Sequence, residues 1–130
     1  MSLDLIAKAI AARDHAMAPY SSFKVGAALE TKDGRIFTGC NIESSSYGLT
    51  VCAERVALFK ALSEGVADFR QIATTTDAPM LTPPCGACRQ LLWEYCGDIV
   101  VYLHSLKGLD QQFRLSELFP LPFDSRNLKA

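Results

Sequence analysis

The apolar residues in the first third of the chain change from helical spacing to strand spacing. Over residues 3–17 they recur as on one face of a helix, and the pattern ends before the segment APYSS. From Phe23 to Leu29 they occupy every second position, which is typical of a strand. The segment KDG, followed by RIFTGC, completes a predicted β-hairpin.

The middle of the chain predicts two helices separated by a strand. We expect the first helix over residues 51–63, with Thr50 as its N-cap and Gly65 just past its end. After its first turn this helix is apolar almost all round, so it should be central in the fold. The segment FRQIATTT predicts a strand. A second helix is expected over residues 86–95, entered through prolines.

Two strands are predicted near the C-terminus, DIVVYLH and QQFRL, with only SLKGLD between them. A parallel crossover needs a dozen or more residues, so these last two strands should be antiparallel. Together the elements predict an α/β fold, a three-layer sandwich in which a mixed five-stranded sheet carries helices on both faces. No repeat or linker interrupts the pattern, so residues 1–130 are expected to form a single domain.

Composition narrows the class of protein. Apolar residues make up 49% of the chain, which favours additional burial in an oligomer. Lys and Arg number 13 against 14 Asp and Glu, and no basic stripe is present, so neither nucleic acid nor a membrane is an expected partner. The N-terminal segment carries Asp4 and Lys8 and lacks a cleavage-site pattern, so we expect no signal peptide. Five cysteines, an odd number, indicate a reduced cytoplasmic protein.

Three of these cysteines lie at the starts of the two central helices. Cys85 and Cys88 share a face because they are three residues apart, and Cys52 begins the other helix. Thiolates at positive helix termini suit Zn²⁺. The candidates for a fourth ligand do not lie at ligand spacing, and they are His15, His104, Cys40 and Cys96. Three ligands and an open fourth position are typical of a catalytic zinc that holds water.

Two charged residues follow Cys52 where a buried helix begins. Burying the charge of Glu54 would cost free energy unless the carboxylate had a function or a partner. Side chains of the first turn tilt toward the N-terminus and can gather in front of the helix tip, so Cys52 and Glu54 can face one pocket. We therefore expect Glu54 to interact with the water bound to the metal. Arg55 can donate hydrogen bonds to ligand sulfurs and offset their negative charge. Arg89 is a second candidate for that task, but it could equally well be a solvated residue on the surface of its helix.

Other interpretations of the cysteines stay open at this point. A lone C-x-x-C in a chain of this kind is a redox pair about as often as half of a zinc site. The motif PCGAC lacks a strand leading directly into it, which disfavours the thioredoxin-like alternative. Cys52 could be a small buried apolar residue, although its neighbour Glu54 argues against this.

Five motifs occur together over nearly the whole chain: PYSSFKVGAAL, GCNIE, SYGLTVCAER, PPCGACRQLLWE and LFPLPF. In combination they resemble the small, homotetrameric type of cytidine deaminase, in which a glutamate acts beside zinc. The resemblance implies hydrolysis of cytidine and deoxycytidine to uridine and deoxyuridine, with release of ammonia, in pyrimidine salvage. It also implies one Zn²⁺ per chain, held by Cys52, Cys85 and Cys88, with Glu54 as the proton shuttle.

The resemblance further implies a set of substrate contacts. They are Phe23 against the nucleoside, Asn41 and Glu43 on the ribose hydroxyls, the backbone of Ala53 on the pyrimidine carbonyl oxygen, and Tyr47 and Phe123 reaching into active sites of neighbouring subunits of a homotetramer. Phe23 and Phe123 are also plausible as core or interface aromatics. Cys40 and Cys96 match no position of the family pattern and are expected to be packing residues.

The residue at the first zinc-ligand position differs between branches of the zinc deaminase superfamily. Enzymes that edit nucleic acids typically have histidine where this chain has Cys52, so the chain resembles the nucleoside deaminases more closely than the editing enzymes. Their last sheet connection is generally a helix, where this chain has only SLKGLD. Both features imply a free nucleoside as the substrate.

Two rival functions remain at this point. Blasticidin S deaminase has a similar CAE motif and cysteine pair but lacks the NIE motif, so Asn41 and Glu43 favour the nucleoside. A structural zinc or redox-sensing domain would leave Glu54 unexplained, and it would need a fourth ligand or a reversible disulfide.

Overall fold

A mixed five-stranded sheet forms the middle layer of the computed structural model, which describes residues 3–128. The strand order is β2-β1-β3-β4-β5, with β3 and β4 parallel and the other neighbouring pairs antiparallel. This confirms the predicted three-layer α/β sandwich and its antiparallel last strands. The elements are α1 (Leu3–Arg13), β1 (Gly26–Thr31), β2 (Ile36–Cys40), η1 (Tyr47–Leu49), α2 (Ala53–Ser63), β3 (Phe69–Thr76), α3 (Gly86–Cys96), β4 (Val100–Ser105), β5 (Leu109–Arg114), α4 (Leu115–Leu118) and η2 (Ser125–Leu128).

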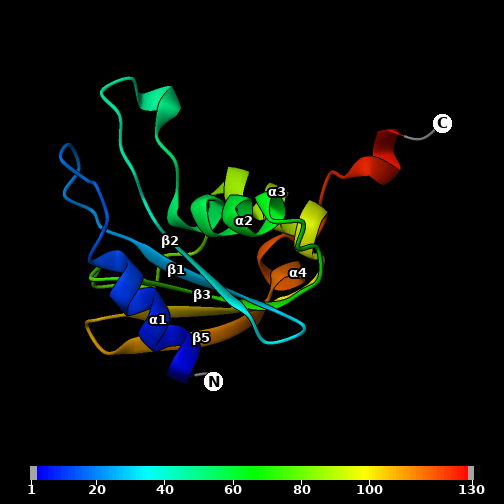
Figure 1. Ribbon diagram of the computed structural model, residues 1–130, viewed down its shortest axis with the longest axis horizontal. Helices are drawn as coiled ribbons and strands as arrows, with labels where there is room; N and C mark the ends of the chain where they lie inside the picture. The colour runs from blue at the N-terminus through cyan, green and yellow to red at the C-terminus, as the bar shows by residue number, and fades with distance from the viewer. Residues whose placement is uncertain (1–2, 129–130) are drawn as a thin grey trace.

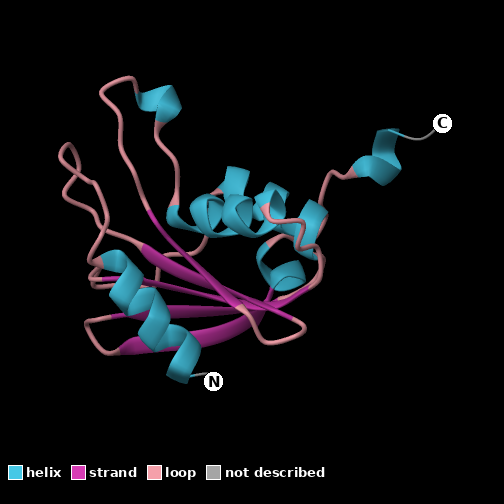
Figure 2. Cartoon of the chain, viewed as in Figure 1, coloured by secondary structure: helices cyan, strands magenta, loops and turns pink. Residues whose placement is uncertain are grey.

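Helices cover both faces of the sheet. Helix α1 lies on one face, and α2, α3 and α4 lie on the other (Figure 1). In Figure 2 the helices on either side of the magenta strands make these layers visible. The period-2 alternation of β1 explains the arrangement, because Ala28 faces α1 while Ala27 and Leu29 face α2. Among residues 3–128 no helix has the length and apolar character needed to cross a membrane.

Two glycines let helices lie directly on the sheet. A Cβ added at Gly39 of β2 would lie 2.6 Å from the backbone nitrogen of Ala57 in α2. A Cβ added at Gly26 of β1 would lie 2.7 Å from the backbone nitrogen of Arg13 in α1. Each glycine therefore permits a backbone approach that a larger residue would prevent. Gly39 in particular determines how closely the first turns of α2 approach the sheet.

Two of the predicted boundaries near the N-terminus are wrong. Helix α1 ends at Arg13, because the chain turns there and Met17 then pairs with Ile42 in an isolated bridge. Strand β1 begins at Gly26 and excludes Phe23. The preceding residues are held by a side chain instead of a strand ladder, since Asn41 bonds the backbone of both Phe23 and Val25.

The predicted start of the central helix is also two residues too early. Val51 pairs with Ile42 in an extended bridge, so α2 begins at Ala53 and its N-cap is Cys52. Thr50 is therefore not the N-cap. The side chain of Cys52 makes no capping hydrogen bond. Its thiol is thus directed to other partners at the tip of the helix.

Candidate metal centre and adjoining pockets

Three cysteine thiols meet where the N-termini of α2 and α3 converge. Cys52 is the N-cap of α2, Cys85 is the N-cap of α3, and Cys88 lies in the first turn of α3. Their sulfur atoms all lie within 4.8 Å of one another, and those of Cys52 and Cys85 are 3.7 Å apart. We call these residues the three-sulfur site. Thiolates converging from two helix termini fit a Zn²⁺ ion, and the packing of α2 against α3 brings the donors together.

One thiol of this site, that of Cys52, loses its proton readily. The pKa of Cys52 is lowered to about 5, first because the Cys88 thiol donates a hydrogen bond to it and also because Arg55 is close. The pKa of Cys88 is raised, since its proton is held in that hydrogen bond and the thiol is buried. One thiolate is therefore available near neutral pH. A divalent cation would displace the remaining protons.

Arg55 contacts the three-sulfur site as the sequence suggests. Its Nη2 lies 3.4 Å from the sulfur of Cys52 and 3.4 Å from the carbonyl oxygen of Thr50. This places a guanidinium where it can offset the charge of several thiolates. Arg89 has a different task, because its Nη1 donates a hydrogen bond of 2.8 Å to the carbonyl oxygen of Leu118 at the end of α4. Arg89 therefore ties α3 to the C-terminal part of the chain.

A cavity of about 180 Å³ adjoins the three-sulfur site. Cys52, Cys85 and Glu54 line it together with three residues singled out from the sequence, which are Phe23, Asn41 and Ala53. Glu54 is only 6% exposed, and its burial raises the pKa of the carboxyl group to about 7. A carboxyl with this pKa can both accept and donate a proton near neutral pH. The cavity thus combines a candidate metal site with a candidate acid and base.

Asn41 stands at the edge of this cavity and organises its wall. Its Nδ2 donates to the carbonyl oxygen of Phe23 at 2.7 Å, and its Oδ1 accepts from the backbone nitrogen of Val25 at 2.9 Å. Asn41 is nearly buried, with 8% of its surface exposed. The amide therefore positions the Phe23 segment against the cavity, a task that the sequence pattern did not indicate.

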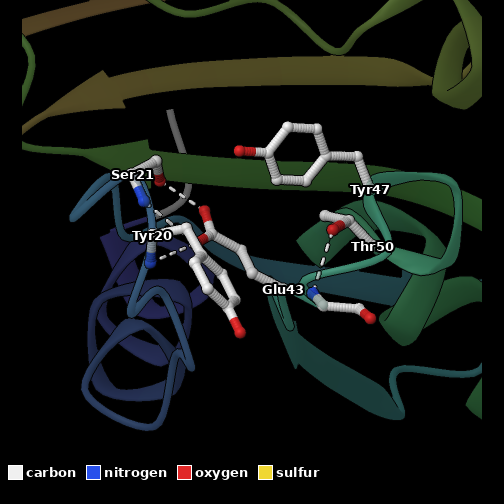
Figure 3. A pocket seen from close by; sticks show the side chains of 6 residues that line it. Tyr20, Ser21, Glu43, Tyr47 and Thr50 are labelled. Carbon is white, nitrogen blue, oxygen red and sulfur yellow. Dashed lines mark hydrogen bonds between the residues drawn. The ribbon is translucent and has the colours of Figure 1, made fainter.

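Glu43 lines a second, adjacent pocket of about 320 Å³, shown in Figure 3. Thr50 lines both pockets, so the two are neighbours. The carboxylate of Glu43 accepts hydrogen bonds from the backbone nitrogens of Tyr20 at 3.0 Å and Ser21 at 3.1 Å, and from the Ser21 hydroxyl. These bonds, led by that of the hydroxyl, lower the pKa of Glu43. Sequence reasoning missed Ser21, although the PYSS motif places a short polar residue at this turn.

Tyr47 and Phe123 do not line the cavity that contains Glu54. Tyr47 lies in η1, is 79% exposed and lines the Glu43 pocket. Phe123 is 57% exposed and belongs to the C-terminal segment, which extends away from the sheet in Figure 1. Both side chains are therefore accessible to another molecule.

The remaining two cysteines lie apart from the three-sulfur site. Cys40 ends β2, and Cys96 ends α3, where burial raises the pKa of its thiol to about 12. All five cysteines are free thiols. Neither Cys40 nor Cys96 offers a sulfur to the cluster formed by the other three.

Comparisons with known proteins give this arrangement a context. Residues 2–104 match the family model described as the cytidine and deoxycytidylate deaminase zinc-binding region. A cytidine deaminase of Halalkalibacterium halodurans is 53% identical over 125 residues, which cover 95% of each protein. The crystal structure of a cytidine deaminase from Burkholderia pseudomallei matches with a TM-score of 0.91 and 46% identity, covering 95% of this chain and 100% of that one. A blasticidin-S deaminase of Bacillus cereus is 34% identical over 107 residues, 76% of each protein.

Proposed function

Because this chain belongs to the cytidine and deoxycytidylate deaminase family, we propose that it hydrolyses cytidine and deoxycytidine to uridine and deoxyuridine. One water is consumed and one ammonia is released per turnover. The pathway served would be pyrimidine salvage. The observation that carries the proposal is a single cavity lined by Glu54 and by thiols of the three-sulfur site.

Cys52, Cys85 and Cys88 would hold one Zn²⁺ ion in this mechanism. When bound, zinc supplies Lewis-acid activation of water, bringing its pKa toward about 7. The thiols fit the ion because their sulfurs already converge and because the pKa of Cys52 is low. Arg55 would stabilise the anionic ligand set through its bond to the Cys52 sulfur.

Glu54 would move the protons of the reaction. As a carboxylate it accepts a proton from the attacking water. As an acid it donates that proton to ring nitrogen N3 while the oxygen adds at C4. It then takes the second proton from the hydroxyl group at C4 and passes it to the amino group, so that the C–N bond breaks, ammonia leaves and the C4 carbonyl forms. The raised pKa of Glu54 supports this double role, because both protonation states are accessible near neutral pH.

The remaining contacts would recognise a nucleoside. The backbone N–H of Ala53 belongs to the first turn of α2, where donors have no intrahelical partner, and it would bind the pyrimidine carbonyl oxygen. Phe23 would pack against the nucleoside. Asn41 and Glu43 would bind ribose hydroxyls, since each keeps hydrogen-bonding capacity beyond the bonds it already makes.

The proposal includes assembly into a homotetramer with shared active sites. Tyr47 and Phe123 would complete the pockets of neighbouring subunits, and their exposure outside the Glu54 cavity supports this. The five free thiols support the expected cytoplasmic location.

Metal analysis combined with the absorbance change of cytidine tests the proposed function. Replacing Cys52, Cys85 or Cys88 with alanine should remove zinc and turnover together. Cys40→Ala, which removes a thiol outside the site, should keep both. Full zinc occupancy and turnover in any of the three site variants would contradict the ligand assignment.

Glu54→Gln separates chemistry from metal binding, because it keeps the shape of the side chain but removes the proton carrier. We expect zinc to be retained and turnover to fall by ~10²–10⁴, the usual range for general acid–base catalysis. Near-normal turnover would mean that another group moves the proton.

A comparison of substrates distinguishes a nucleoside deaminase from a blasticidin S deaminase and from a structural zinc protein. Cytidine and deoxycytidine should be processed, while free cytosine, 3′-deoxycytidine and blasticidin S should be poor substrates. The proposed contact is mainly to the 3′-hydroxyl, which deoxycytidine keeps. A site built to bind this hydroxyl rejects analogues without it, because polar groups of the site are left unpaired. A protein that binds zinc but processes none of these compounds would favour the structural-zinc alternative.

A further inference from the structure

The turn formed by Tyr20 and Ser21 holds the side chain of Glu43, which is expected to bind ribose. Three donors of this turn converge on the Glu43 carboxylate, namely the two backbone N–H groups and the Ser21 hydroxyl (Figure 3). Ser21 and Glu43 are 22 residues apart in the chain. The orientation of the carboxylate is therefore set by a distant segment and not by its own loop alone.

The Ser21 hydroxyl makes a second bond that leads toward the Glu54 cavity. Its oxygen accepts a hydrogen bond of 3.0 Å from the backbone nitrogen of Phe23, whose side chain lines that cavity. A hydroxyl can donate once and accept twice, so it can serve Glu43 and Phe23 at the same time. Ser22, which lies between Ser21 and Phe23 in the chain, has a φ of 61°, a left-handed conformation that a serine adopts at some energetic cost. Contacts around the turn must stabilise that conformation.

Asn41 also holds residues 20–25 by hydrogen bonds. Its amide bonds the backbone of Phe23 and Val25, while Glu43 bonds the backbone of Tyr20 and Ser21. The two ends of the NIE motif thus fix residues 20–25 at two points, with Phe23 at their junction.

We propose that Ser21 is a positioning residue that fixes the Glu43 carboxylate and the Phe23 segment relative to each other, and thereby sets selectivity for the sugar of the nucleoside. This inference rests on the proposed function. It extends that function to a residue that touches neither the metal site nor the reacting base. Ser21 acts through Glu43, because the carboxylate is the partner that anchors its hydroxyl.

A double-mutant cycle with Ser21→Ala and Glu43→Ala tests this coupling. In the wild-type background, Ser21→Ala should lower kcat/KM for cytidine about 3- to 10-fold, the size of one lost hydrogen bond, mainly through a higher KM. In the Glu43→Ala background the same change should have almost no effect, because groups that act as a unit are not additive. Ser21→Thr, which keeps the hydroxyl, should restore the wild-type KM. Ser45→Ala removes an exposed hydroxyl of the neighbouring loop and should change nothing.

An equal loss from Ser21→Ala in both backgrounds would overturn the proposal, and so would a failure of Ser21→Thr to rescue. Amide hydrogen exchange gives a readout that does not depend on turnover. The N–H groups of Tyr20 and Ser21 should exchange more rapidly in Glu43→Ala than in wild type. If wild type ignores cytidine but Glu43→Ala still speeds this exchange, the proposed function fails while the positioning contact stands. Unchanged exchange would refute the positioning role itself.

Discussion

Gly39→Ala should damage the candidate site although it replaces none of the residues assigned to that site. The added Cβ would lie 2.6 Å from the backbone nitrogen of Ala57 and closer still to the carbonyl oxygen of Ala53. The first of these distances is about 0.8 Å short of the 3.4 Å at which ordinary contact begins. Both obstacles are backbone atoms of α2, so no side-chain rotation can relieve the clash. The helix must move away from β2.

The displacement of α2 determines the size of the effect. Overpacking of this kind costs about 1–3 kcal/mol, which should lower Tm by several degrees in a chain of this size. The start of α2 carries Cys52 and Glu54, and a misplacement of about 1 Å can reduce activity ~10²-fold. We therefore expect Gly39→Ala to lower kcat/KM for cytidine by about that factor, together with zinc affinity.

Gly26→Ala is the matched control for this experiment. Its Cβ would lie 2.7 Å from the backbone nitrogen of Arg13, so it should displace α1, which covers the opposite face of the sheet and carries no site residue. Tm should fall in both variants, whereas only Gly39→Ala should lose zinc affinity and kcat/KM. Assays are run below both Tm values, with bound zinc and absorbance as readouts. Equal activity loss in the two variants, or none in Gly39→Ala, would refute the reasoning.

Three further changes test other parts of the structure. Arg55→Gln removes the guanidinium bond to the Cys52 sulfur and should weaken zinc binding ~10–100-fold, measured by chelator competition. Bonds led by that from Arg126 lower the pKa of Asp124, so its stabilising effect is complete above the unfolded value of about 3.9 and is lost as pH falls toward the lower folded pKa. Because the single tryptophan donates its Nε1 to this carboxylate at 2.9 Å, its fluorescence should change in that acid range in wild type but not in Asp124→Asn. Phe123→Ala should lower kcat/KM ~10-fold, the scale of one aromatic contact, and mixing it with Glu54→Gln should restore activity in reassembled oligomers.

Each of these predictions has a control. Arg89→Gln removes a guanidinium that bonds Leu118, so zinc affinity should not change. Asp98→Asn alters another carboxylate whose pKa is lowered, and it should leave the acid response of the tryptophan intact. For the mixing experiment, no recovery despite verified subunit exchange would mean that Phe123 serves only its own chain or none.

The periodicity of the sequence was enough to predict most of the sheet. The structure has β3 at Phe69–Thr76, the full length of the predicted segment, and β4 and β5 are antiparallel as predicted. The connection between them is only residues 106–108, because the strands include Ser105 and Leu109, which the sequence pattern places in the SLKGLD connection. These features depend on residue alternation and on chain length, which are local properties. For the same reason the spacing of Cys85 and Cys88 predicted that they share a helix face.

Contacts between distant segments decided where the central helix begins and how the site side chains are oriented. The central helix starts at Ala53 because Val51 pairs with Ile42, and no property of the helix sequence alone reports that bridge. The Asn41 amide is bound to the Phe23 segment, and the Glu43 carboxylate to the Tyr20–Ser21 turn, so both orientations depend on a loop about twenty residues earlier.

The sequence by itself therefore determined which residues are candidates for the site, while the tertiary structure decided what surrounds them. Glu54 shows the difference. Its position beside Cys52 is written in the chain, but its raised pKa comes from burial in a cavity formed by several elements. Likewise, Cys52 joins Cys85 and Cys88 only because α2 packs against α3. Desolvation and convergence are properties of packed segments, and a linear pattern of residues does not contain them.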